Sequence, residues 1–184
     1  MLNNLRARLL SLKFRAIRRA VIILIAKIPK DLERAITFGD ALNHFLMISP
    51  FRPLFKFSIP KNIKVNVHDL TFDSPIISAS FKDDISSLFQ WQLIGIGGIT
   101  YKTVLKMPSK GNLRPRIQEV SHDGNYAILN SLGLPTKGVK KFLPQINNKK
   151  LTKFNRPIGI SIGGNSFEEY LSVFSEIDHH LNTI

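Results

Sequence analysis

The feature that most constrains the fold of this chain is a repeated alternation of apolar strands with helical sequence. Segments expected to form buried strands lie at residues 75–77, 93–99 and 157–162, and helical sequence follows them. Strands that alternate with helices indicate parallel β/α units, whose ligand sites lie at the carboxyl ends of the strands. The sequence therefore predicts an α/β fold whose functional side chains come just after the strands.

Two of the expected helices have clear start signals. Asp83 and Asp84 precede the helical segment 85–89 and place negative charge at the positive end of its dipole. After the third strand, a capping box is expected in which the Ser166 hydroxyl accepts from the Glu169 amide and the Glu169 side chain returns to the Ser166 amide. The apolar face predicted for this last helix consists of Phe167, Tyr170, Leu171, Phe174 and Ile177.

The number of β/α units is too small to close a barrel. A (β/α)8 domain needs about 200 residues or more, and about 125 residues follow position 60. We therefore expect residues 61–184 to form a partial (β/α)8 TIM barrel of about three units, preceded by amino-terminal helices. Such a chain is a fragment, a truncated gene product, or a protein that obtains its missing surface elsewhere, because a partial barrel exposes unpaired strand edges.

Residues 1–60 are predicted to be a basic helical extension followed by a linker. Residues 1–30 contain no acid and carry the basic residues Arg6, Arg8, Lys13, Arg15, Arg18, Arg19, Lys27 and Lys30. The apolar run at 20–26 is far shorter than the roughly 20 residues that span a bilayer. We expect this segment to lie on an anionic membrane surface. The alternative is a basic helix packed on the body of the protein.

Two short helices are expected between the basic segment and the linker. Asp31 can cap the first, Gly39 is expected to interrupt it, and Asp40 can cap the second. The prolines of the segment 50–53 end helix formation. Two short strands around a turn are then predicted between residues 65 and 72.

The composition narrows the range of partners. Lys and Arg number 26 against 13 acidic residues, and the formal charge of +13 suits a phosphate-bearing cofactor, an acidic lipid surface or nucleic acid. Aromatic residues are sparse among the basic ones, so no nucleic-acid partner is expected. The chain has no cysteine, which excludes disulfides, thiolate metal sites and a cysteine nucleophile within it. No acid or histidine cluster has metal-ligand spacing, so no metal is expected.

The most informative stretch for function runs from Lys102 to Leu134. It contains, in order, Lys102-Thr103, Pro108, Gly111-Asn112, Pro115-Arg116 and Leu129-Asn130-Ser131-Leu132-Gly133-Leu134. This series resembles the flavin and pyrimidine site of dihydroorotate dehydrogenases, particularly the soluble class of that family. The resemblance covers roughly residues 63–180 and includes the stretches Val65–Phe72 and Gly163–Tyr170.

This resemblance implies an oxidoreductase that uses flavin mononucleotide (FMN) to oxidise dihydroorotate to orotate in pyrimidine biosynthesis. By matching position, the residues that would contact the flavin are Ala79, Ser80, Lys102 and Ser161. The residues that would contact dihydroorotate are Lys102, Asn130, Leu132, Gly133 and Leu134. The family's general base is a cysteine in soluble members and a serine in membrane-bound ones, and it falls after the third unit. No residue of this chain is assigned as the catalytic base.

Three positions depart from the family pattern. Phe81 stands where glycine commonly follows Ala-Ser, and a bulky side chain there would oppose close approach of the backbone to the flavin. Thr136 and Lys137 replace the usual asparagine and small residue of the substrate loop. The amino-terminal helices resemble those of the membrane-bound, quinone-using class instead. The two halves of the chain thus point to different electron acceptors.

A second hypothesis is a non-catalytic, membrane-associated or partner-binding remnant of the same family. Both hypotheses place the protein in the cytoplasm, with peripheral attachment to the inner face of the membrane as an option. Another chain that completes the barrel is a further expected partner. Residues 163–165 before the last helix could bind phosphate at its amino terminus, although a simple strand-to-helix turn is more common.

Overall fold

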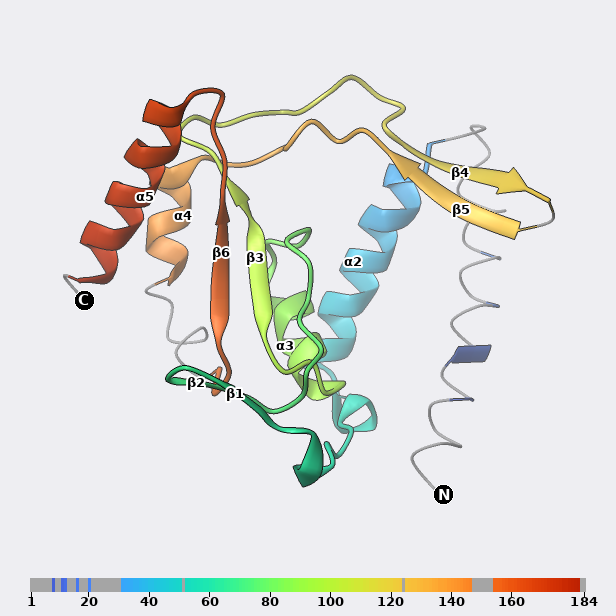
Figure 1. Ribbon diagram of the computed structural model, residues 1–184. Helices are drawn as coiled ribbons and strands as arrows, with labels where there is room; N and C mark the ends of the chain where they lie inside the picture. Colours follow the sequence, from blue (N-terminus) through green and yellow to red (C-terminus); the bar gives the residue numbers. More distant parts are fainter. Residues whose placement is uncertain are drawn as a thin grey trace. The chain divides into compact units, whose positions relative to one another are not determined.

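The computed structural model describes residues 31–50, 52–123, 125–146 and 154–182, together with positions 8, 11, 12, 16 and 20 (Figure 1). These residues belong to two compact units. The first unit contains residues 1–42 and 112–133, and the second contains residues 43–111 and 134–184. The predicted interfacial helix of residues 1–30 lies outside the described residues apart from those five positions. The predicted domain boundary after residue 60 stays a prediction.

The second unit is built around parallel strands. β3 (Ile99–Val104) pairs in parallel with β6 (Ile158–Ile162), so that Ile99 lies opposite Ile158. The edge of β3 that faces away from β6 contacts the segment before α3. There the Lys102 amide donates to the Lys82 carbonyl at 3.1 Å. A parallel bridge also joins Ile77 to Gly98. Three parallel segments therefore lie in the order 76–82, β3, β6.

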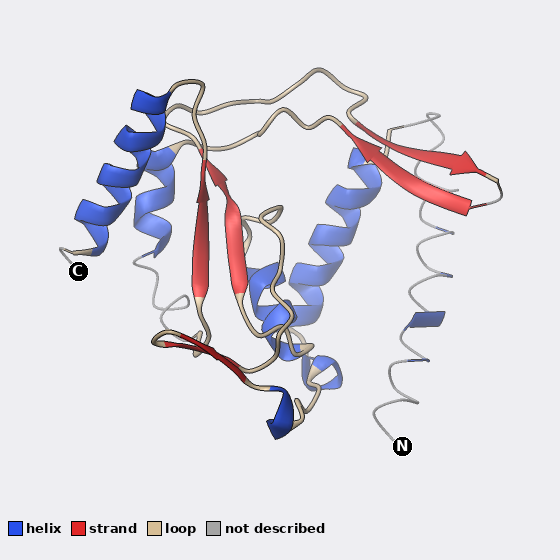
Figure 2. Ribbon diagram, viewed as in Figure 1, coloured by secondary structure: helices blue, strands red, loops and turns tan. Residues whose placement is uncertain are grey.

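Helices cover one face of this sheet. α3 (Ile85–Leu93), α4 (Val139–Ile146) and α5 (Phe167–Leu181) all contribute to one hydrophobic core with β3 (Figure 2). The buried side chains of this core are Leu88, Ile99, Tyr101, Val104, Val139, Phe142, Phe154, Val173 and Ile177. Full burial of an aliphatic side chain of this size stabilises the fold by about 1.5–3 kcal/mol. The predicted α/β fold with a partial barrel is confirmed, and the described strands form no closed barrel.

The predicted strand boundaries are wrong at two places. Residues 93–98 do not form a strand, because α3 continues to Leu93 and the chain then turns at Gly95, whose φ of 99° favours glycine. Residues 75–77 do not form a buried strand either. Ile77 makes only an isolated bridge, and the Ile76 and Ile77 side chains are 62% and 54% exposed.

The predicted helix starts are largely confirmed. Asp84 is the N-cap of α3 and accepts from the Ser87 amide at 2.8 Å. Ser166 is the N-cap of α5 and accepts from the Glu169 amide at 3.3 Å. The return bond of the capping box is different, because the Glu169 carboxylate accepts from the Asn165 amide at 2.7 Å. The box therefore closes one residue earlier than predicted.

The first unit consists of a β-hairpin and the start of a helix. β4 (Ile117–His122) and β5 (Asn125–Asn130) pair antiparallel in continuous register, with Ile117 opposite Asn130. The Leu32 amide donates to the Ile117 carbonyl at 2.9 Å. Arg116 forms a two-pronged contact with the Glu33 carboxylate, and both side chains are mostly buried. The hairpin and the helix start thus share an ion pair that is largely removed from solvent.

The remaining elements precede β3 in the chain. α2 (Glu33–Ile48) runs without interruption through Gly39 and Asp40, so the prediction of two separate helices is wrong. It ends before the prolines, as predicted, and the 3₁₀ helices η1 (Arg52–Phe55) and η2 (Lys61–Ile63) follow. β1 (Val65–Val67) and β2 (Leu70–Phe72) form the predicted hairpin around a turn.

Candidate functional site

The carboxyl ends of the three parallel segments lie next to one another in the second unit. The Ser78 amide donates to the Gly98 carbonyl at 3.1 Å, and the Ser78 hydroxyl accepts from the Thr100 amide at 3.1 Å. These bonds hold the following residues, Ala79 and Ser80, beside β3. Ala79 is exposed and Ser80 is half-buried. Both remain accessible to a ligand.

Lys102 lies on the sheet face opposite the core. Its neighbours along β3, Ile99 and Tyr101, are buried among the helices, and side chains alternate between the two faces of a strand. Lys102 is half-buried. Among the described residues, no side chain or carbonyl forms a hydrogen bond or an ion pair with its ammonium group. The ammonium therefore remains available to an anionic or carbonyl-bearing ligand.

A pair of hydroxyl groups links the ends of β3 and β6 on this same face. Thr103 Oγ1 and Ser161 Oγ are 3.0 Å apart, which is a hydrogen bond in which either oxygen can donate. The pairing of β3 and β6 is irregular between Tyr101 and Val104, and this irregularity brings Thr103 to the face that carries Ser161. Thr103 was not among the predicted contact residues. Its position directly after Lys102 was the signal that could have identified it.

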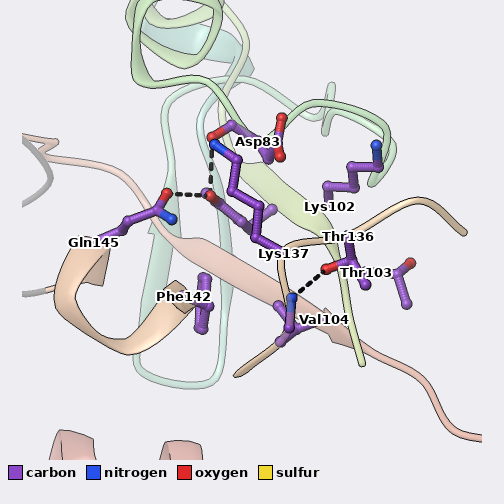
Figure 3. A pocket seen from close by; sticks show the side chains of 10 residues that line it. Asp83, Lys102, Thr103, Val104, Thr136, Lys137, Phe142 and Gln145 are labelled. Carbon is purple, nitrogen blue, oxygen red and sulfur yellow. Dashed lines mark hydrogen bonds between the residues drawn. The ribbon is translucent and has the colours of Figure 1, made fainter. Parts of the chain in front are cut away.

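A small hollow lies beside the end of β3 (Figure 3). It is lined by residues of β3 and α4 and of the loops between them, among them Asp83, Lys102, Thr136, Lys137 and Gln145. Its volume is about 10 Å³, about the space of one water molecule. A planar ring system cannot enter it. A larger ligand would have to lie on the open face of the sheet.

The Tyr101 hydroxyl closes the inner side of this hollow. It donates to the Asp83 carbonyl at 2.9 Å and contacts Gln145 Oε1 at 2.8 Å. Burial raises the pKa of Tyr101 above its ordinary value, and the nearby Asp83 and Asp84 carboxylates raise it further. The phenol stays protonated under physiological conditions. It joins β3 to α4 and is not suited to act as a base.

Phe81 packs against an aromatic neighbour. Its ring centroid is 5.1 Å from that of Trp91, with the planes tilted by 43°. The Phe81 amide donates to the Ala79 carbonyl at 3.0 Å, which makes a tight turn after Ala79 and Ser80. The bulky side chain thus has a partner on α3.

The residues predicted to hold the substrate fall mostly in the first unit. Asn130 is the last residue of β5 and is exposed. The Leu132 carbonyl accepts from the Asn112 amide at 3.0 Å. Gly133 has a φ of 68°. A Cβ atom on Gly133 would lie 2.6 Å from Asn112 Oδ1, so only glycine fits there. Leu134 belongs to the second unit.

Asn112 organises this loop, a role that the sequence alone did not reveal. Its side-chain amide donates to the Ser131 carbonyl at 2.9 Å, and its own carbonyl accepts from Arg116 at 3.1 Å. The Ser131 amide donates in turn to the Arg116 carbonyl at 2.8 Å. Asn112 and Arg116, one residue from each of the Gly-Asn and Pro-Arg pairs, therefore shape the loop that carries Leu132 and Gly133.

The amino terminus of α5 is not free to bind phosphate. Ser166 and Glu169 already accept from backbone amides there, and Ser166 is also close to the Glu168 carboxylate. Hydrogen bonding by its own backbone amide, and then by the Ser166 hydroxyl, lowers the pKa of Glu168. A carboxylate at this position opposes a second anion. In the part of the chain that the structure describes, no group of His, Asp and Glu side chains is arranged to hold a metal ion.

Parallel strands covered by helices on one face, with polar groups at their carboxyl ends, are typical of proteins of the β/α-barrel class. The sequence profile that describes dihydroorotate dehydrogenase matches residues 62–184, well over half of the chain. The chain belongs to the dihydroorotate dehydrogenase family, as the motif series between Lys102 and Leu134 predicted.

Relatives with two different electron acceptors match this chain. The catalytic subunit of dihydroorotate dehydrogenase B (NAD(+)) from Endomicrobium trichonymphae is 33% identical over 116 residues, which cover 61% of this chain and 36% of that protein. Dihydroorotate dehydrogenase (quinone) from Synechococcus sp. (strain JA-2-3B'a(2-13)) is 29% identical over 137 residues, which cover 74% of this chain and 35% of that protein. The chain spans about a third of the length of these curated relatives.

Solved structures support the fold. A crystal structure of DHODH from Eimeria tenella in complex with ferulenol matches with a TM-score of 0.51 and 20% identity, over 68% of this chain and 36% of that one. The ligand-free type from the same organism matches with a TM-score of 0.51 over 72% of this chain. Both likenesses concern the arrangement of strands and helices. Within the residues that the structure describes, none of the helices combines the length and the hydrophobicity that a membrane span requires.

Proposed function

We propose that this chain forms part of a dihydroorotate dehydrogenase that binds FMN and oxidises dihydroorotate to orotate in pyrimidine biosynthesis. Membership of the family supports this function at the level of the reaction class. The observation that carries the proposal is the grouping of Ala79, Ser80, Lys102 and Ser161 at the carboxyl ends of adjacent parallel segments. Ligands of parallel β/α proteins bind at these ends.

The residues present fit a flavin. A flat ring with several carbonyl and imide groups needs an open face, hydrogen-bonding groups and a cation, and the face that carries Lys102, Thr103 and Ser161 offers all three. Ala79 and Ser80 would approach the ring through their backbone. Phe81 does not prevent this contact in our proposal, because its ring packs on Trp91.

The residues of this chain would bind and orient the reactants. When bound, FMN supplies the acceptor for the two electrons that leave the substrate. The Lys102 ammonium would hold both flavin and substrate and stabilise negative charge that develops between them. Asn130, Gly133 and the backbone at Leu132 and Leu134 would pair with the polar edges of dihydroorotate.

No residue of this chain is proposed as the general base. In the family the base follows the third β/α unit, and the chain spans about a third of its curated relatives. We therefore expect the purified chain by itself to form little or no orotate. The electron acceptor stays open, since relatives of the NAD(+) and quinone types both match.

The second candidate is a non-catalytic protein of the same family that associates with membranes. The observation that favours it lies in the sequence, where residues 1–30 contain eight basic residues and no acid. Such a segment is attracted to anionic lipid headgroups. In either case we propose a cytoplasmic protein, held at the inner face of the membrane where this segment binds.

Titration of the purified chain with FMN, followed by visible absorption, tests the first proposal. We expect a perturbed flavin band with the unaltered chain, and Lys102→Ala is expected to weaken binding about tenfold or more, because a hydrogen bond to a charged group is worth about 1.5–3 kcal/mol. Lys61→Ala, an exposed lysine of η2, is the matched control. Absence of flavin binding by a chain with a native circular dichroism spectrum would leave the second candidate.

A further inference from the structure

The loop that carries Leu132 and Gly133 is held by one arginine. The Arg116 carbonyl accepts from the Ser131 amide at 2.8 Å, and the Arg116 guanidinium donates to the Asn112 carbonyl at 3.1 Å. Asn112 donates in turn to the Ser131 and Leu132 carbonyls. A displacement of Arg116 is therefore transmitted to both sides of the loop.

The side chain that holds the Arg116 guanidinium comes from the start of α2. Both carboxylate oxygens of Glu33 accept from this guanidinium, and the Arg116 and Glu33 side chains are only 15% and 17% exposed. Two-pronged arginine–carboxylate pairs fix the orientation of the two groups as well as their separation. Because the pair is largely removed from solvent, loss of the carboxylate charge leaves the guanidinium poorly compensated.

The position of Glu33 is itself fixed within the first unit. The Leu32 amide donates to the Ile117 carbonyl at 2.9 Å, and the Glu33 amide donates to the Asp31 carboxylate at 3.0 Å. The Arg114 guanidinium bridges the two acids, at 2.7 Å from Asp31 Oδ2 and 3.3 Å from Glu33 Oε2. Figure 1 shows the first turn of α2 beside the end of the hairpin at which β4 begins and β5 ends. Backbone and side-chain bonds thus anchor the helix start to the base of the hairpin.

We infer that Glu33 is a positioning residue for the pyrimidine ligand: it orients Arg116, which sets the geometry of the loop at residues 130–133. The inference rests on the proposed function for the identity of the ligand, dihydroorotate or orotate. It gives the amino-terminal extension a part in the substrate site. The start of α2 and the loop belong to the same compact unit, although they are far apart in the sequence.

The tight packing of the loop explains why its orientation matters. A Cβ atom on Gly133 would lie 2.6 Å from Asn112 Oδ1, so a shift of Asn112 displaces Gly133 with it. Polar groups that bind a planar ligand must be held within about 0.5 Å of their productive positions. A small rotation of Arg116 is therefore expected to lower the affinity for the ligand while the hairpin stays folded.

Two measurements on the purified 184-residue chain test the inference: amide hydrogen exchange followed by NMR, and orotate binding followed by calorimetry. Glu33→Gln keeps the size of the side chain and removes its charge. It is expected to accelerate exchange of the Ser131 and Asn112 amides about tenfold or more. It is expected to weaken orotate binding at least about threefold. The affinity for FMN is expected to stay unchanged, because the proposed flavin contacts, Lys102 and Ser161 among them, lie in the second unit.

A double-mutant cycle with Arg116→Gln separates positioning from general stability. If Glu33 acts through Arg116, Glu33→Gln has no further effect on orotate binding in the Arg116→Gln background. Glu168→Gln, which removes a carboxylate from the first turn of α5, is the matched control and is expected to leave both measurements unchanged.

Equal exchange of the Ser131 amide in Glu33→Gln and in the unaltered chain overturns the inference. An equal acceleration of all amides of β4 and β5 overturns it as well, because this pattern reports a general loss of stability. Additive effects of Glu33→Gln and Arg116→Gln on orotate binding have the same consequence. Absence of orotate binding by the unaltered chain contradicts the proposed function instead, whereas the exchange measurement, made without ligand, still decides whether Glu33 positions the loop.

Discussion

Phe81 is the residue at which this chain departs most sharply from the family pattern, and it has a packing role of its own. Its ring lies 5.1 Å from that of Trp91, and its side chain is 56% exposed. A tilted aromatic pair contributes about 0.5–1.5 kcal/mol beyond the area that it buries. The substitution therefore adds a contact between the loop after Ser80 and α3.

Replacement of Phe81 by alanine tests whether its ring stabilises the fold through Trp91 or obstructs the binding of flavin. Phe81→Ala is expected to lower the free energy of unfolding by about 1 kcal/mol, because the contact with Trp91 is lost. Trp91 is the only tryptophan of the chain, so urea unfolding followed by its fluorescence reports this change directly. The affinity for FMN is expected to stay within about threefold of that of the unaltered chain.

The control for this prediction is Phe45→Ala, which removes another exposed phenylalanine that lies on α2. This variant is expected to leave the Trp91 emission unchanged. A large gain in FMN affinity for Phe81→Ala would instead mean that the ring obstructs the flavin, as the glycine pattern of the family suggests.

The second prediction at the residue scale concerns Asp31 and the pH dependence of stability. The backbone amide of Glu33 lowers the pKa of Asp31 below its ordinary value of 3.8, and Arg114 lowers it further. A carboxyl whose pKa is lower in the folded state stabilises the fold above its unfolded pKa and loses this effect as the pH falls through the folded value. Asp31→Asn is thus expected to lower the melting temperature at pH 7 and to converge with the unaltered chain as the pH falls through the folded-state pKa of Asp31.

Thermal melting followed by circular dichroism, repeated from pH 7 to acidic pH, measures the difference in melting temperature between Asp31→Asn and the unaltered chain. Asp69→Asn, which removes a carboxylate from the turn between β1 and β2, serves as the control for the loss of one negative charge. If Asp31→Asn melted at the same temperature as the unaltered chain at pH 7, the ionised carboxylate would not contribute to the helix start.

At the scale of elements, the cap of α5 makes a contribution that can be isolated. The Ser166 hydroxyl accepts from the Glu169 amide, one of the amides without a partner inside the helix. Ser166→Ala is expected to destabilise the protein by about 1 kcal/mol in urea unfolding. Ser175→Ala, at an exposed position of the same helix, is expected to be neutral or slightly stabilising. Equal effects of the two substitutions would contradict a capping role.

The elements were predictable where the signal is local. Asp84 and Ser166 cap helices through bonds within three residues, and the sequence shows both. Gly39 was misleading, because its cost within a helix, about 1 kcal/mol relative to alanine, was not enough to end α2. The register of β3 depends on pairing with β6, more than fifty residues later, so the boundary at Ile99 could not be read from residues 93–98 alone.

In the candidate site, too, local signals were visible in the sequence and long-range contacts were not. Ala79, Ser80, Lys102 and Ser161 were predicted by matching position in the resemblance to the family, and their roles stay predictions. The Thr103–Ser161 hydrogen bond and the contacts of Asn112 join residues that are distant in the sequence, and nothing in their spacing predicts them. These contacts depend on the pairing of β3 with β6 and on the loop that surrounds Gly133.

At the scale of the whole molecule, the net charge of +13 is the dominant property. Part of it is concentrated at the amino terminus, in residues 1–30. An anionic membrane attracts each basic residue near its surface by about 1 kcal/mol, and this attraction weakens with salt. The distribution of charge, and not only its sum, therefore decides whether the chain binds to a membrane.

Charge reversal in two different parts of the chain distinguishes the effect of the charge distribution from the effect of the net charge. Arg15→Glu, Arg18→Glu and Arg19→Glu are combined in one variant, and Lys61→Glu, Lys140→Glu and Lys141→Glu in another, so that both have the same net charge. In cosedimentation with phosphatidylserine-containing vesicles, the first variant is expected to bind at least about tenfold more weakly than the unaltered chain. The second is expected to bind nearly as well as the unaltered chain.

Equal loss in both variants would mean that the total charge, and not the amino-terminal segment, holds the protein on the membrane. Binding that persists on neutral phosphatidylcholine vesicles or at 1 M salt would show that the contact is not electrostatic.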